Sequence, residues 1–378
     1  IEAGSYTEVF DLAEQELDTI AVGGVKAIPT GDADDPQLWK LISFAKDGRS
    51  LVLDPADGSF ELRESNVLPS PVTTHSVGVG PDGDLYVGAY LSPNVMGRLD
   101  PNSNEVTVLS GPEQADSVTT VGEHLVVTSY PNAVVHVGTV DEPWEWDSNP
   151  HKVLDGTAYD QDRIFEVVDA DGVAVIGSVP KYGLLGGAIT VFDPATGELQ
   201  SYPGVAGDLS IGALAYQRGF VYGGTTVQGG VGGVPDPDAE GEIFVFDMTA
   251  GEVTHSAVVV AGAKTIGGLC FGRRQLWGIT ETGVIFRYDL RRYRVAESVE
   301  IPGGSSGTNW GRLPDLQFNQ MDGLFYGITA TRQFFTFDGR TNEVHIIDHE
   351  HEAKALQVMP GGHVYLVNET NLLYLDPR

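Results

Sequence analysis

Three side chains in the sequence have types that suit acid–base chemistry on a sugar. His75, Tyr130 and Tyr182 each lie at the end of a short apolar run, where a strand meets a loop. Removal of the proton next to a uronate carboxylate needs a base, and cleavage of the neighbouring glycosidic bond needs an acid. We expect His75 to act as the base, and Tyr182 or Tyr130 to act as the acid. The alternative for His75 is a structural histidine at a strand start.

Such an elimination also needs positive charge, because a cation that neutralises the carboxylate acidifies the proton to be removed. Arg163, Lys264 and Lys354 precede apolar runs and are expected to converge as a cationic well in an otherwise acidic chain. The alternative is that each pairs with a neighbouring Asp or Glu. The residues expected to bind substrate are Arg163, Lys181, Lys264, Arg312, Trp310, Tyr90 and Lys354.

Other reactions are less well represented among the residues. A glycoside hydrolase would need two suitably spaced carboxyl groups, for which Asp116 and Glu166 are candidates. The sequence has no serine nucleophile elbow, no phosphate-binding glycine loop and no paired Cys/His zinc spacing. These classes are therefore disfavoured.

The sequence gives only weak support for metal binding and for a reactive thiol. His349 and His351 have a spacing that could place two imidazoles on one side of a strand, but a solvated loop is the simpler interpretation. The acidic segment 236–242 could hold a structural calcium ion, although it lacks the ordered calcium-loop pattern. Cys270 is the only cysteine, and its apolar and glycine neighbours indicate a small buried side chain. We expect no cofactor.

The secondary structure that must position these residues can be inferred from one repeat unit, residues 172–199. Two short β-branched runs are joined by a Gly-bearing loop, and the second ends in the turn Asp193-Pro-Ala-Thr-Gly197, which indicates an antiparallel meander. Degraded copies of this turn recur about every 40 to 50 residues, which is the blade length of a β-propeller. The copies begin at Asp54, Asp100, Asp141, Asp247, Asp289, Asp338 and Asp376.

The repeat predicts an all-β protein with a single β-propeller domain over residues 1–378. We expect eight four-stranded blades, with seven as the alternative, and a ring closed by strand 6–12 completing the last blade. Two long loops, 228–242 and 301–314, are expected at one mouth of the ring. Second strands are expected at 38–44, 85–90, 125–130, 173–179, 220–226, 276–280, 324–329 and 363–367.

Composition narrows the range of partners. The chain of 378 residues carries 22 Lys and Arg against 53 Asp and Glu, a net charge of −31. Such a surface disfavours nucleic acid and anionic membranes as partners. No apolar run is long enough to span a membrane, and the first residue is Ile1 rather than Met. We expect a processed, extracellular, monomeric protein.

The Asp-Pro-x-Thr-Gly turns and Leu-Tyr-x-Gly strands resemble a broad group of secreted bacterial β-propellers. This group includes gluconolactonase-like, streptogramin-lyase-like and YVTN-type repeat proteins. The segments that begin at Tyr182 and Gly223 are similar to those of secreted propellers found with polysaccharide-degrading modules. The resemblance implies that propeller lyases using His, Tyr and Arg are a model for this chain.

Two classes of function follow. The first is an extracellular carbohydrate-active enzyme, a lyase acting on a uronate-containing glycan, with a hydrolase as its close variant. The second is a non-catalytic propeller that binds a glycan or a protein as a module of a larger extracellular protein. In the first class the partner is an anionic oligo- or polysaccharide.

Overall fold

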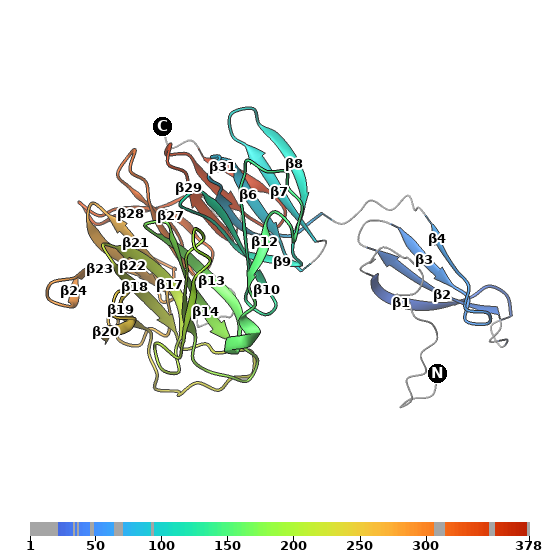
Figure 1. The fold of residues 1–378 in the computed structure, drawn as a ribbon, viewed down its shortest axis with the longest axis horizontal. Coiled ribbons are helices and arrows are strands. Elements are labelled where there is room, and N and C mark those ends of the chain that lie inside the picture. The colour runs from blue at the N-terminus through green and yellow to red at the C-terminus, as the bar shows by residue number, and fades with distance from the viewer. Residues whose placement is uncertain are drawn as a thin grey trace. The chain divides into compact units, whose positions relative to one another are not determined.

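The computed structural model describes residues 22–32, 35, 38–45, 49–63, 71–91, 94–305, 314–347 and 352–375 (Figure 1). The chain divides into two compact units, Ile1–Val72 and Thr73–Arg378. The assignment of residues 1–378 to one domain stays a prediction. The first unit contains one antiparallel sheet with its strands in chain order: β1 (Val22–Pro29), β2 (Trp39–Ala45), β3 (Ser50–Leu53) and β4 (Phe60–Arg63).

The second unit contains seven antiparallel sheets, each with its strands in chain order. The first three are β5 (Thr74–Val79), β6 (Leu85–Ala89), β7 (Val95–Asp100), β8 (Glu105–Ser110); β9 (Gln114–Val121), β10 (His124–Tyr130), β11 (Val134–Gly138), β12 (His151–Leu154); and β13 (Gln161–Ala170), β14 (Val173–Pro180), β15 (Ala188–Phe192), β16 (Leu199–Pro203). The next two are β17 (Ser210–Gln217), β18 (Phe220–Thr226), β19 (Glu242–Asp247), β20 (Glu252–Val258); and β21 (Ile266–Gly272), β22 (Gln275–Thr280), β23 (Val284–Asp289), β24 (Arg294–Glu300). The last two are β25 (Asp315–Phe318), β26 (Phe325–Ile328), β27 (Phe334–Asp338), β28 (Glu343–Ile347); and β29 (Ala355–Val358), β30 (Val364–Val367), β31 (Leu372–Leu375). A short 3₁₀ helix, η3 (Gly156–Tyr159), precedes β13.

The seven sheets of the second unit form a closed ring. The first strand of each sheet, its inner strand, contacts the inner strand of the next sheet, and β29 contacts β5. Backbone N–H of Thr74 donates to the carbonyl of Glu369 at 3.0 Å across this closure. The inner strands therefore surround a common axis.

The predicted fold class is confirmed. Among the described residues the protein is all-β with eight antiparallel sheets, seven of which form the ring, and all eight predicted second strands are present as β2, β6, β10, β14, β18, β22, β26 and β30. Seven sheets have four described strands and the last has three. The closing strand predicted over 6–12 lies outside the described residues.

The recurring Asp turn connects the third and fourth strands of a sheet. In the copy at Asp193, the carboxylate accepts from the backbone N–H of Ala195 at 2.8 Å, and Gly197 N–H donates to the Asp193 carbonyl at 2.8 Å. Gly197 has φ 75°, a conformation that favours glycine or asparagine. The turns after Asp100 and Asp338 close in the same way. Asn104 and Asn342 occupy the positive-φ position in these two turns. The sequence of the repeat therefore varies while the conformation of its turn is kept.

Several second strands have a glycine opposite a phenylalanine of the third strand, and these aromatic–glycine pairs have a steric cause. A Cβ atom on Gly223 would lie 2.0 Å from Cζ of Phe244, which is the residue paired with it on the third strand. The same arrangement joins Gly278 to Phe286 and Gly327 to Phe335. Each glycine therefore makes room for a buried ring on the neighbouring strand.

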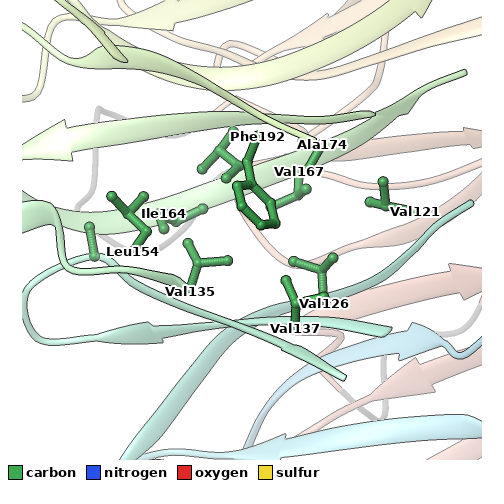
Figure 2. Close-up of a cluster of buried hydrophobic side chains, with 11 residues drawn as sticks. Val121, Val126, Val135, Val137, Leu154, Ile164, Val167, Ala174 and Phe192 are labelled. Atoms are coloured by element: carbon green, nitrogen blue, oxygen red, sulfur yellow. The ribbon is translucent and has the colours of Figure 1, made fainter. Parts of the chain in front are cut away.

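Adjacent sheets pack face to face through apolar side chains. Between the sheets β9–β12 and β13–β16, Val126 and Val135 lie opposite Ile164, Val167 and Phe192 (Figure 2). All five side chains are buried. These rigid interfaces fix the inner strands and hence the loops at their ends. In the part of the chain that the structure describes, no helix is long and apolar enough to cross a membrane.

Candidate functional site

His75 lies next to the start of the inner strand β5 and is held by the neighbouring sheet. Its Nε2 lies 3.2 Å from Oδ1 of Asp116 and 3.2 Å from Nε2 of Gln114. The Gln114 amide also donates to Asp116 Oδ1 at 2.6 Å. The Asp116 side chain is 2% exposed and that of His75 is 26% exposed, so a buried carboxylate orients a solvent-accessible imidazole. The Tyr90 ring lies 5.3 Å from the imidazole.

Two tyrosines meet beside this group. The hydroxyls of Tyr130 and Tyr182 are 2.7 Å apart. The guanidinium carbon of Arg163 lies 4.3 Å from the centre of the Tyr130 ring. The hydrogen bond with Tyr182, helped by burial, raises the pKa of Tyr130 to about 12. Near neutral pH, Tyr130 is therefore a proton donor rather than a phenolate base.

Gln114 joins the two groups, because it contacts His75 and is the β-sheet partner of Tyr130. The combined set, here called the rim cluster, comes from three successive sheets. Its inner-strand members all lie near the starts of β5, β9 and β13. The rim cluster consists of His75, Tyr90, Gln114, Asp116, Tyr130, Arg163 and Tyr182.

The loop that carries Tyr182 is supported by the neighbouring sheet. Lys181 donates through Nζ to the carbonyl of Thr157 at 3.0 Å and lies 3.4 Å from Asp160 Oδ1, so it stays beside the rim cluster in a weak ion pair. The long loop 228–241 hydrogen bonds to the same segment, with Gly230 N–H donating to Leu184 O at 3.0 Å. A Cβ on Gly230 would lie 1.8 Å from the Lys181 carbonyl, so only glycine permits this approach.

The other predicted cations are not part of the rim cluster. Lys264 Nζ donates to the carbonyl of Pro237 at 3.0 Å and also to that of Ala239. Lys354 Nζ forms an ion pair with Glu369 at 2.9 Å, which lowers the pKa of that carboxyl group. Lys354 therefore pairs with a glutamate, as the alternative interpretation expected, whereas Lys264 is held by two carbonyl oxygens. Trp310, Arg312, His349 and His351 lie outside the described residues.

The residues proposed for metal binding have other partners. In the segment 236–242, the Asp236 carboxylate accepts from the backbone N–H of Asp238 at 2.9 Å, and Glu240 accepts from the backbone N–H of Gly262. Glu242 accepts from the Ser256 hydroxyl at 2.6 Å. Among the described residues, no group of three or more His, Cys, Asp or Glu has an arrangement that could hold a metal ion. A calcium site here stays a prediction.

Two carboxyl groups face the axis of the ring. Glu166 on β13 and Asp315 on β25 belong to sheets that are not neighbours, yet the charge of Asp315 acts on Glu166. Burial, aided by this repulsion, raises the pKa of Glu166 to about 8, and burial raises that of Asp315 to about 6. Burial likewise raises the pKa of the Cys270 thiol, whose residue was predicted to be buried and is half-buried in the structure.

A cavity of about 1580 Å³ opens at the other end of the inner strands. Its lining includes Val79, Thr120 and Val358, which lie at or near the ends of β5, β9 and β29. The rim cluster lies near the starts of its inner strands. This cavity and the rim cluster are thus at opposite ends of the inner strands.

Comparison with known proteins identifies the fold. No family model matches the chain, and no curated protein matches it. Among solved structures, the crystal structure of the WD40 β-propeller domain of Doa1 superimposes with a TM-score of 0.59. It covers 80% of this chain and 92% of that domain at 12% sequence identity. The protein is therefore a β-propeller, and at this identity the likeness concerns the fold alone.

Proposed function

We propose that the protein binds an anionic oligo- or polysaccharide at the rim cluster. The supporting observation is that His75, Arg163 and the Tyr130–Tyr182 pair, which come from different sheets, meet at one rim. Phenol, imidazole and guanidinium groups supply hydrogen bonds for sugar hydroxyls and carboxylates, and the aromatic rings supply apolar contact. The proposal is for an extracellular, monomeric protein.

Loss of the arginine should weaken this binding. For Arg163→Gln we expect about tenfold weaker binding of polygalacturonate oligomers, because a charge-assisted hydrogen bond contributes about 1.5 kcal/mol or more. Isothermal titration calorimetry at low salt measures the change. Arg292→Gln is the matched control, since Arg292 is an exposed arginine on the β23–β24 turn and its loss changes the net charge equally. Equal affinities for both variants, or no binding by the wild type, would contradict the proposal.

A second candidate function is cleavage of the bound uronate glycan by β-elimination. Two observations favour it: the imidazole of His75 is oriented by the buried Asp116 carboxylate, and the raised pKa of Tyr130 keeps that phenol protonated. In this mechanism Arg163 neutralises the carboxylate, His75 takes the C5 proton, and Tyr130 or Tyr182 protonates the leaving oxygen. A hydrolase is less well supported, because the buried Asp116 carboxyl is engaged with Gln114.

The two candidate functions are distinguished by whether a cleavage product forms. A lyase generates an unsaturated uronate that absorbs ultraviolet light, and this signal should disappear in His75→Ala and fall in Tyr182→Phe. The binding of oligomers by His75→Ala is measured in parallel, because a folded variant that binds without forming product identifies the step that is lost. Wild-type binding without any ultraviolet signal from a panel of acidic polysaccharides would leave the non-catalytic module as the function.

A further inference from the structure

Two adjacent arginines form the turn between β21 and β22. Its central residues, Arg273 and Arg274, have φ 52° and 66°. A two-residue turn of this kind needs positive φ at both central positions, and glycine is preferred at the second. In the corresponding turns of the two preceding sheets, the second position is Gly172 or Gly219. Arg274 is therefore held in a conformation that is costly for a residue with a Cβ atom, and such strain often marks a functional position.

The turn borders a pocket at the end of the inner strands that lies opposite the rim cluster. This arginine pocket has a volume of about 480 Å³, which is the size of a small-molecule site. Both arginines line it, and no Asp or Glu is found among its described lining residues. That is unusual in a chain with 53 acidic and 22 basic residues. The other side chains in the lining are Gln217, Phe271, Phe318 and Gln320.

The charge of the two arginines is not neutralised by the described part of the chain. Nη2 of Arg273 donates to the carbonyl of Gly323 at 3.0 Å, a contact that positions the guanidinium but supplies no negative charge. Hydrogen bonds from Arg340 lower the pKa of Asp338 to about 2, with a smaller contribution from the charge of Arg273, so this carboxylate is already paired. Neither Arg273 nor Arg274 forms an ion pair with a described residue.

The two aromatic rings of the arginine pocket are held by the core behind them. The ring centre of Phe318 lies 4.9 Å from that of Phe325, and the ring of Phe271 meets that of Tyr222 edge to face at 5.5 Å. Phe325 and Tyr222 are buried, whereas Phe271 and Phe318 are half-buried and line the pocket. The apolar part of a ligand would therefore meet fixed rings beside the guanidinium groups.

The larger cavity at the same end of the ring constrains the length of the ligand. It adjoins the arginine pocket, because Phe318 and Gln320 line both. Its lining contains Asp82, Glu123 and Asp141, with no lysine or arginine among the described lining residues. A polyanionic chain that extended from the pocket into this cavity would be repelled there. The charges therefore favour a small anion.

We propose that the arginine pocket binds a small organic oxyanion, in which a phosphate, sulfate or carboxylate group is attached to an apolar ring. The forked guanidinium groups of the two arginines bind the oxygen atoms, and the two phenylalanine rings pack against the ring of the ligand. The two glutamine amides supply further hydrogen bonds. The site is separate from the rim cluster, so this proposal does not depend on glycan binding.

A ligand-observed NMR titration of the full chain tests the proposal. The probes are phenyl phosphate, phenyl sulfate and benzoate, which share the ring and differ in the oxyanion. We expect at least one of them to bind saturably, and the tightest identifies the preferred oxyanion. Inorganic phosphate and benzyl alcohol each carry one part of the ligand, and we expect both to bind about tenfold more weakly than that probe.

Substitution of Arg274 connects binding to the pocket. Arg274→Gln should weaken the tightest probe about tenfold, because it removes a charge-assisted hydrogen bond. Arg291→Gln is the matched control, since Arg291 is exposed on the β23–β24 turn, outside the pocket, and its loss changes the net charge equally. Arg274→Gly restores the residue type of the two preceding turns. It should lose binding while its melting temperature stays at least as high as that of the wild type, which excludes unfolding as the cause.

Three results would overturn the proposal. Equal affinities in Arg274→Gln and Arg291→Gln would mean that the probe binds elsewhere. Failure of the full chain to bind any of the three probes would mean that the pocket is not a site, or that another part of the same chain occupies it. Displacement of the probe by polygalacturonate oligomers would contradict a separate site for a small anion.

Discussion

Replacement of Glu166 by glutamine is expected to stabilise the fold by about 2 kcal/mol at pH 9 and to leave it almost unchanged at pH 4. The carboxyl group faces the ring axis, where burial and the charge of Asp315 raise its pKa to about 8. In the unfolded chain the same group ionises near pH 4.3. The folded state therefore binds an extra proton between these values, and stability falls as pH rises through this window.

The expected magnitude is smaller than the full pKa difference implies. A shift of this size would correspond to about 5 kcal/mol, but Glu166 is only half-buried, and charges that are partly exposed to solvent are screened. Glutamine keeps the shape of the side chain and carries no charge, so the pH dependence should flatten.

Urea unfolding across this pH range measures the effect, with Glu198→Gln on the exposed β15–β16 turn as the control. Asp315→Asn should lower the pKa of Glu166 and give a partial version of the same result. An unchanged pH dependence in Glu166→Gln would contradict the placement of both carboxyl groups at the axis.

The fold was predictable because its turns depend on local chemistry. An Asp that accepts from the N–H two residues later, followed by a residue able to adopt positive φ, can be recognised even when Gly197 is replaced by Asn104 or Asn342 in other copies. Second strands were located by the same logic, since each lies between a tight turn and a glycine-bearing stretch. The closure of the ring depends instead on packing between residues far apart in the sequence, such as Val77 and Tyr365. Such packing leaves no pattern in the local sequence.

The rim cluster was predictable in part for a related reason. His75, Tyr130, Arg163 and Tyr182 lie at strand ends, and a closed ring brings such ends together. Gln114 was missed, because an uncharged amide gives no chemical signal in the sequence until its contacts with His75 and Asp116 are seen. Lys264 and Lys354 have the same sequence signature as Arg163. In the structure the two lysines bind oxygen atoms of their own surroundings, whereas Arg163 lies over the Tyr130 ring of the rim cluster.

Replacement of Gly223 by alanine is expected to destabilise the ring by about 2 to 3 kcal/mol, because overpacking a well-packed core has costs in this range. The new Cβ would lie 2.0 Å from Cζ and 2.1 Å from Cε1 of Phe244. The Phe244 ring is 1% exposed and belongs to the core shared with the sheet β13–β16, so it has no open space into which to move.

Gly97→Ala is the matched control for this effect. Gly97 also lies within a strand and has no positive φ, but the atom nearest to its added Cβ is Val87 Cβ at 3.9 Å, an ordinary contact. The control variant should be as stable as the wild type or slightly more stable, because alanine restricts the unfolded chain more than glycine does. Thermal unfolding of both variants measures the difference. Adding Phe244→Leu to Gly223→Ala should recover part of the loss if the ring is its cause. If Gly223→Ala and Gly97→Ala unfold at the same temperature, the aromatic–glycine pairs do not set the spacing of the second and third strands.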